Sequence, residues 1–161
     1  MITFRPNDRK ILEAITWVAN TVEHCPAQTI LQILFYADKF HLQKYGRPVT
    51  GDIYKKTAYG PAASTAYDFL HEENDAQAFS ICNNCVLPKR AALEDWLSGT
   101  DVACLKESVD AYGTMNIFQE TAYVHSDMGH VIDYALFIDN NMPDRNEFLK
   151  YIEESSLCQV M

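Results

Sequence analysis

The chain has 161 residues, 48% of them hydrophobic, which is enough to form one well-packed domain without disulfides or metal. No run approaches the roughly 20 apolar residues of a membrane helix, and the first ten residues lack the apolar core of a secretory signal. Together with five irregularly spaced cysteines, these features predict a cytoplasmic protein without a membrane partner.

The net charge of −9 is concentrated in the second part of the chain. Residues 1–60 carry eight Lys/Arg and five Asp/Glu, whereas residues 61–161 carry five Lys/Arg and seventeen Asp/Glu. Acidic surfaces repel phosphate backbones, so we expect no direct contact with nucleic acid and favour a basic protein partner. Taken alone, the charge is explained more simply by an acidic surface that keeps the protein soluble.

Hydrophobic periodicity predicts two helices at the start of the chain. Asn7 or Asp8 can cap the first helix, whose apolar residues recur at helical spacing as far as Val22. The second helix, over residues 27–45, is apolar on nearly all sides, which is typical of a central, buried helix. Gly46 is a strong signal for its end.

A short strand, a helix and a hairpin are predicted next. Residues 53–59 alternate like a strand, and Pro61 can start a helix that reaches residue 70. Two short apolar runs flank Asn83 and Asn84, which tolerate positive φ, so this segment predicts a two-residue hairpin. Helices followed by a small hairpin resemble a winged-helix layout, although the acidic charge argues against DNA binding.

The pattern of the remaining residues, from 91 onward, predicts mainly helices. Ser98 and Asp101 form a capping-box pattern at the start of one of them. We therefore expect a mainly α fold, a compact helical domain of six to seven helices with a small, winged-helix-like β-hairpin. Residues 1–142 are expected to form the domain, and residues 143–161 a helical extension of it. The predicted segments are a helical turn over 91–97 and helices over 98–113, 117–125, 129–137 and 145–154.

Cys82 and Cys85 have the spacing of zinc ligands or of a redox pair. A structural zinc site needs two further ligands, and no second pair of cysteines or histidines has suitable spacing. We therefore favour half-buried strand residues over a metal site, and we expect no cofactor.

Two histidines lie close to carboxylates in sequence. His125 and His130 are near Asp127 and Asp133, and His130 and Asp133 would share a helix face. Such a pair could act in acid–base chemistry, but neither an activated nucleophile with an oxyanion hole nor a nucleotide-binding loop accompanies it. We favour surface hydrogen bonding and expect no catalytic residues and no enzyme activity.

The most specific feature is a series of short motifs within residues 34–70. The series resembles the signature of the Panacea domain of SocA-like antitoxins, and it covers about a quarter of the chain. Its members are Tyr36-Ala37-Asp38 with His41, the run from Tyr45 to Asp52, Tyr59-Gly60-Pro61, and Tyr67-Asp68.

This resemblance implies a protein that binds a cognate toxin, which the charge suggests is basic, and neutralises it. Neutralisation would proceed by blocking the toxin or, as in a proteolytic adaptor, by delivering it to a ClpXP-type protease. The alternative is a regulatory or anti-defence protein of a phage or mobile element that binds a host protein on the same scaffold.

The motif residues are expected to fall into two groups. Four are expected to be exposed and to form the first partner-binding candidates, namely Asp52, Tyr54, Lys55 and Tyr59. The others are expected to build the scaffold, with turns at Gly51 and Gly60 and a hydrogen bond between Asp38 and His41. The scaffold group is Tyr36, Asp38, His41, Tyr45, Gly46, Pro48, Thr50, Gly51, Gly60, Pro61 and Tyr67.

Overall fold

A computed structural model describes residues 1–58, 60–71, 77–112, 129–155 and 158–160 of the chain. Its helices are α1 (Asp8–Thr21), α2 (Ala27–Tyr45), α3 (Ser64–His71), α4 (Gly99–Ala111) and α6 (Arg145–Glu153), with 3-10 helices η1 (Glu94–Trp96) and η3 (Tyr134–Phe137). Its strands are β1 (Ile2–Phe4), β2 (Cys25–Pro26), β3 (Tyr54–Thr57), β4 (Gly60–Ala63), β5 (Phe79–Cys82), β6 (Cys85–Pro88) and β7 (Cys158–Val160).

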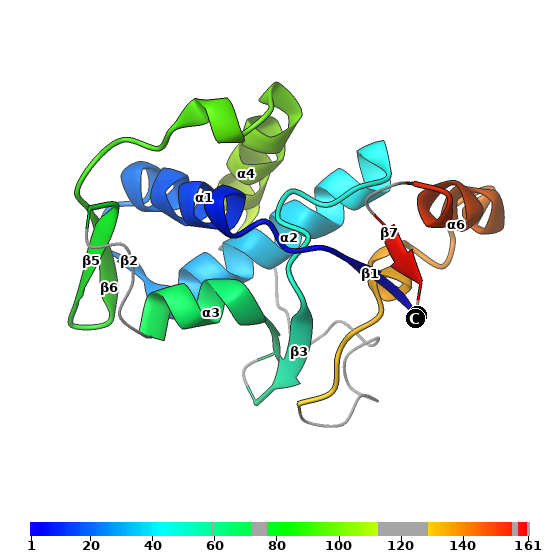
Figure 1. Ribbon diagram of the computed structural model, residues 1–161, viewed down its shortest axis with the longest axis horizontal. Helices are drawn as coiled ribbons and strands as arrows, with labels where there is room; N and C mark the ends of the chain where they lie inside the picture. The colour runs from blue at the N-terminus through cyan, green and yellow to red at the C-terminus, as the bar shows by residue number, and fades with distance from the viewer. Residues whose placement is uncertain (59, 72–76, 113–128, 156–157, 161) are drawn as a thin grey trace.

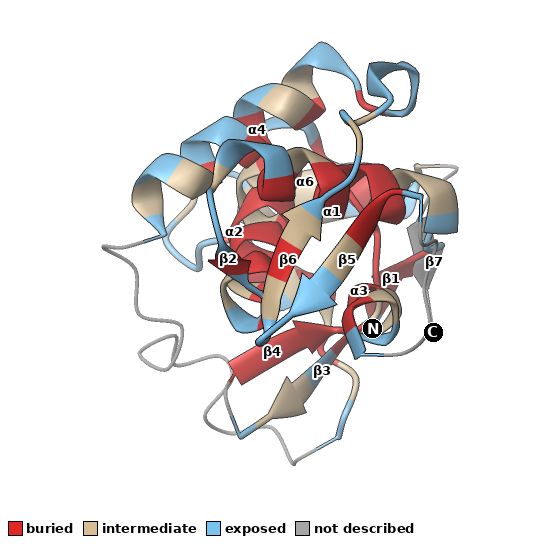
Figure 2. Cartoon of the chain, turned by 90° about the vertical axis from the view of Figure 1, so that its left-hand side faces the viewer, coloured by how far each residue is buried: buried red, intermediate tan, exposed pale blue. Residues whose placement is uncertain are grey.

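Helix α2 forms the centre of the molecule (Figure 1). Helices α1 and α4 lie along one side of it, α3 and β3 lie on the other, and β1, β7 and α6 gather at one end. The apolar side chains of α2 are buried on nearly all sides, as the sequence predicts for a central helix, and Figure 2 shows the exposed residues on the outer elements.

The strands form three small antiparallel sheets, β1–β7, β2–β6–β5 and β3–β4. In the first sheet, Ile2 lies opposite Val160, so the two ends of the chain pair directly. Within the described residues, no helix combines the length and apolar character that crossing a membrane requires.

Several predicted boundaries are confirmed because short-range chemistry determines them. Asn7 accepts a hydrogen bond from the backbone N–H of Lys10 at the start of α1, and Gly46 ends α2 with a left-handed φ of 77°. Asn83 and Asn84 both have positive φ in the turn between β5 and β6, as a two-residue hairpin needs.

The predicted mainly α class with six to seven helices is wrong, because the fold is mixed α/β and the described residues form five α-helices. Pro61 does not start a helix: it lies in β4, whose ladder to β3 and packing against α2 override its local preference. Residues 129–137 also differ from the predicted helix. Val131 forms a β-bridge with Lys55, and the helical part is the 3-10 helix η3 at the end of this segment. The helix predicted over 117–125 lies outside the described residues.

Candidate protein-binding site

Asp38 of α2 is the centre of a buried hydrogen-bond network built from motif residues. Its carboxylate accepts hydrogen bonds from the backbone N–H of Thr50 at 2.7 Å, from the Thr50 hydroxyl at 2.5 Å and from the Tyr54 hydroxyl at 2.5 Å. Burial raises the pKa of Asp38 to about 6, and the three hydrogen bonds act in the opposite direction. The network ties α2 to the segment that leads into β3.

Asp52 holds the start of α3 from a distance in sequence. Its side chain accepts hydrogen bonds from the backbone N–H groups of Thr65 and Ala66 at 3.0 and 2.9 Å, which the helix itself leaves without partners. The Tyr134 hydroxyl donates to the Asp52 carbonyl. Burial raises the pKa of Asp52, and the backbone N–H groups partly offset this rise.

The expectation that the side chains of Asp52 and Tyr54 are exposed is therefore wrong. Both are completely buried, because Asp52 caps a helix and the Tyr54 ring packs against Phe35 and Tyr134 while its hydroxyl reaches Asp38. These two motif residues build the fold.

His41 and Asp38 do not form the predicted hydrogen bond, because each has other partners. The Nδ1 atom of His41 is 2.6 Å from the Arg47 carbonyl, and its Nε2 atom is 2.9 Å from the Thr100 hydroxyl and 3.4 Å from an Asp101 oxygen. Burial lowers the pKa of His41, which favours the neutral imidazole. His41 thus links α2 to the start of α4.

Asp101 completes this link between helices. It forms the predicted capping box with Ser98. Its carboxylate also forms salt bridges with the Lys10 ammonium at 2.9 Å and with the Arg47 guanidinium at 3.0 Å. Burial alone would raise the pKa of Asp101, but hydrogen bonds from Lys10 and from the Ser98 backbone N–H, together with the charges of Lys10 and Arg47, hold it below its usual range. Helices α1, α2 and α4 therefore meet at one buried carboxylate.

The glycines of the motif have positive φ, which other residues adopt only at an energetic cost. Gly51 has a φ of 68°, and a Cβ there would lie 3.1 Å from the Arg5 carbonyl oxygen. Gly60 has a φ of 104° at the start of β4. Among the scaffold candidates, only two side chains are exposed, those of Tyr45 and Tyr67, and the remainder are buried.

Of the three partner-binding candidates that the structure describes, only Lys55 is exposed. Its strand, β3, is bonded on one edge to β4 and on the other to residues 129–132. Tyr59 lies outside the described residues. A partner-binding role for Lys55 stays a prediction.

The cysteine pair and the described members of the histidine–aspartate pairs considered for chemistry lie outside the buried networks described above. Cys82 and Cys85 are free thiols opposite each other in the hairpin, and the described residues contain no group of three or more side chains suited to hold a metal. Asp133 caps η3 and accepts a hydrogen bond from the Ile2 N–H, whereas His130 is exposed. His125 and Asp127 lie outside the described residues.

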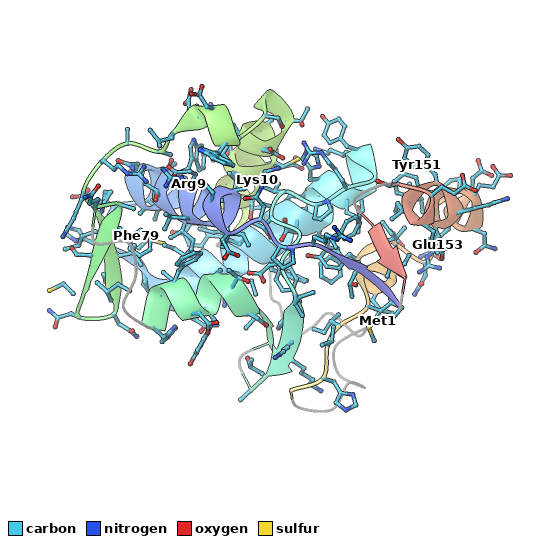
Figure 3. All side chains as sticks on the ribbon, in the orientation of Figure 1. Met1, Arg9, Lys10, Phe79, Tyr151 and Glu153 are labelled. Carbon is cyan, nitrogen blue, oxygen red and sulfur yellow. The ribbon has the colours of Figure 1, made fainter. Side chains whose placement is uncertain are left out.

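Sequence reasoning did not identify a surface formed by two exposed apolar side chains, Leu93 and Trp96, together with the partly exposed Arg9, here called the Trp96 surface. Leu93 and Trp96 are each 44% exposed, and the Arg9 guanidinium carbon is 5.9 Å from the Trp96 ring centroid. Figure 3 shows Arg9 on α1, beside the segment that leads to α4. A signal was present, since Trp96 directly follows two acidic residues, Glu94 and Asp95, beside which a buried tryptophan is less expected.

Comparison with known proteins identifies one family. The model of the family "Antitoxin SocA-like, Panacea domain" matches residues 30–129, which is more than half of the chain and includes every motif described above. Neither the curated proteins nor the solved structures give a match.

Proposed function

Because the chain belongs to the SocA-like antitoxins with a Panacea domain, we propose that it binds a cognate protein toxin directly and neutralises it. The observation that carries this proposal is the family match over residues 30–129. The buried networks around Asp38 and Asp52 support it further, because they use motif residues to hold the fold of the family domain together. We infer a binding role without catalysis.

The charge distribution supports a basic partner. Residues 61–161 carry seventeen Asp/Glu against five Lys/Arg, so their surface attracts cationic proteins and speeds encounter with them. We infer that the toxin presents Lys and Arg on the face that it offers to this chain.

Direct binding to DNA is disfavoured by the composition of α3. The order α1, β2, α2, α3, β5, β6, with β3 and β4 inserted between α2 and α3, and the sheet order β2–β6–β5 resemble a winged-helix layout, in which the third helix would enter the major groove. However, α3 has the sequence STAYDFLH, which contains no Lys or Arg. Phosphate contacts depend mainly on such cations, so we infer that this layout serves protein binding here.

Co-expression with the product of the adjacent open reading frame tests the proposed function. We expect that product to arrest growth when expressed alone, the present chain to restore growth, and the two proteins to co-purify. A product that is harmless alone and does not co-purify would contradict the proposal, and would favour a regulatory or anti-defence protein that binds a host target.

The same experiment in a host without ClpX separates two ways of neutralising a toxin. If the chain blocks the toxin by occupying its surface, rescue persists without the protease and toxin levels stay constant. If the chain is a proteolytic adaptor, rescue is lost and the toxin accumulates in the presence of the chain.

A further inference from the structure

The Trp96 surface has two exposed apolar side chains at the two ends of a single turn. The backbone N–H of Trp96 donates to the Leu93 carbonyl at 3.2 Å, and Leu93 is the residue that precedes the 3-10 helix η1, in which Trp96 is the last residue. Both side chains are 44% exposed, and the Arg9 guanidinium lies over the Trp96 ring. Trp and Arg are the residue types that most often dominate the binding energy of protein interfaces.

A buried carboxylate holds this turn in place. Glu13 of α1 has a fully buried side chain that accepts two hydrogen bonds from the Arg90 guanidinium, at 2.7 and 2.8 Å, and one from the Leu93 N–H at 2.8 Å. Burial alone would raise the pKa of Glu13, but the Arg90 and Leu93 hydrogen bonds lower it below its usual value. The turn is thus ordered before a partner arrives, which reduces the entropy lost on binding.

The charges around the turn specify the chemistry of the partner. Arg9 and Arg90 are both paired with Glu13, whereas Glu94 and Asp95 are exposed and have no cation partner in the described part of the chain. The residues outside the described ranges contain no Lys or Arg. The uncompensated charge beside Leu93 and Trp96 is therefore acidic.

From these observations we infer that Arg9, Leu93 and Trp96 anchor the toxin, with Trp96 and Leu93 inserting into an apolar pocket on the toxin that is rimmed by Lys or Arg. This inference rests on the proposed function, and it adds the surface and the chemistry of contact. Glu94 and Asp95 pair with the cations of the rim, and Arg9 keeps the Trp96 ring in a binding orientation.

The first test compares affinities for the purified product of the adjacent open reading frame. We expect Trp96→Ala to weaken binding about 30-fold or more, as for an interface residue worth about 2 kcal/mol, and Leu93→Ala about tenfold. Leu136→Ala is the matched control, because Leu136 is 42% exposed on η3, and its affinity should equal that of the wild type. Equal binding by the Trp96, Leu93 and Leu136 variants would overturn the inference.

Two measurements do not depend on how well Trp96→Ala folds. The double change Glu94→Gln and Asp95→Asn alters only exposed charges, and it should weaken binding and reduce its salt dependence. In Trp17→Phe, Trp96 is the sole tryptophan, and its fluorescence should shift to shorter wavelength and resist acrylamide quenching when the toxin binds. An unchanged spectrum in a formed complex would contradict burial of Trp96.

The results distinguish the two proposals. If the wild type does not bind the product, the proposed function fails and the anchor fails with it. If the wild type binds and rescues growth while the variants bind equally well, only the anchor is wrong.

Discussion

At the scale of single residues, two buried carboxylates show that motif residues build the core. Asp38 and Asp52 lie in the core with hydrogen bonds from hydroxyl and backbone donors, and no cation pairs with them in the described part of the chain. The motif residues were predictable from the sequence, but their burial was not. An Asp beside a glycine in a turn is exposed in most proteins, and only the position of α3 shows that Asp52 is a helix cap.

Replacing Asp38 with Asn should change how stability depends on pH. The folded-state pKa of Asp38 is raised to about 6 from an ordinary 3.8, so its protonation favours the folded state. This contribution is fully present below the unfolded pKa and is lost as pH rises through about 6. Asp38→Asn cannot ionise, so its free energy of unfolding should gain about 3 kcal/mol relative to the wild type between about pH 4 and about pH 8.

Chemical denaturation of both proteins across this pH range measures the effect. Asp52→Asn should show a change of the same sign, because burial also raises the pKa of Asp52. A constant difference between Asp38→Asn and the wild type at all pH values would show that Asp38 has an ordinary pKa in the folded protein.

Two motif glycines should respond differently to substitution by alanine. Both have positive φ, which costs about 1–2 kcal/mol for an L-residue. At Gly46 the added Cβ would meet the ring of Tyr151, which is 62% exposed and can move. At Gly51 it would meet the backbone of Arg5 and the Cβ of Phe4, which cannot move without displacing β1.

We therefore expect Gly51→Ala to lower the free energy of unfolding by about 3 kcal/mol or more, and Gly46→Ala by about 1–2 kcal/mol. Thermal unfolding of the two variants measures the order. Equal losses, or a larger loss at Gly46, would contradict the proposed difference between a backbone obstacle and a side-chain obstacle.

At the scale of elements, local signals predicted helices better than strands. The apolar periodicity of α2 and its glycine stop act within a few residues, so both its ends were predicted correctly. Strand β4 has the sequence GPAA and no pattern of its own, and its structure comes from pairing with β3 and packing against α2. Such long-range pairing cannot be seen in a single sequence.

The hydrogen bonds of Glu13 in α1 with Arg90 and the Leu93 N–H, here called the clamp, are a second long-range feature. The substitution Glu13→Gln tests what they contribute. The change removes the charge that pairs with Arg90, so we expect a loss of about 2 kcal/mol in the free energy of unfolding. Hydrogen exchange at the Leu93 amide should become faster, since its acceptor is weakened.

Glu107→Gln is a suitable control for Glu13→Gln, because the pair of Lys44 and Glu107 is largely exposed. Its loss should stay below about 0.5 kcal/mol. If both variants lost the same stability and Leu93 kept its protection, the Trp96 surface would not depend on the clamp.

At the scale of the whole molecule, the first and last strands of the structure pair with each other. Pairing of β1 with β7 brings residues 158–160 to the N-terminal strand, and Ile152 of α6 is buried in the common core. The expected division into a domain over residues 1–142 and a helical extension of the same domain over residues 143–161 stays a prediction. The charge asymmetry also belongs to this scale, because it acts over distances longer than any single contact.

The last prediction concerns that charge. With a net charge of −9 and a basic partner, association is steered by long-range attraction, which salt screens over about 10 Å at 0.1 M ionic strength. We expect the association rate constant for the toxin to fall about tenfold or more between low and high salt, while the dissociation rate constant changes much less. Stopped-flow fluorescence of the Trp17→Phe protein measures both rates. An association rate constant that is independent of salt would show that the partner face is not basic, and would leave apolar contacts such as Trp96 as the basis of recognition.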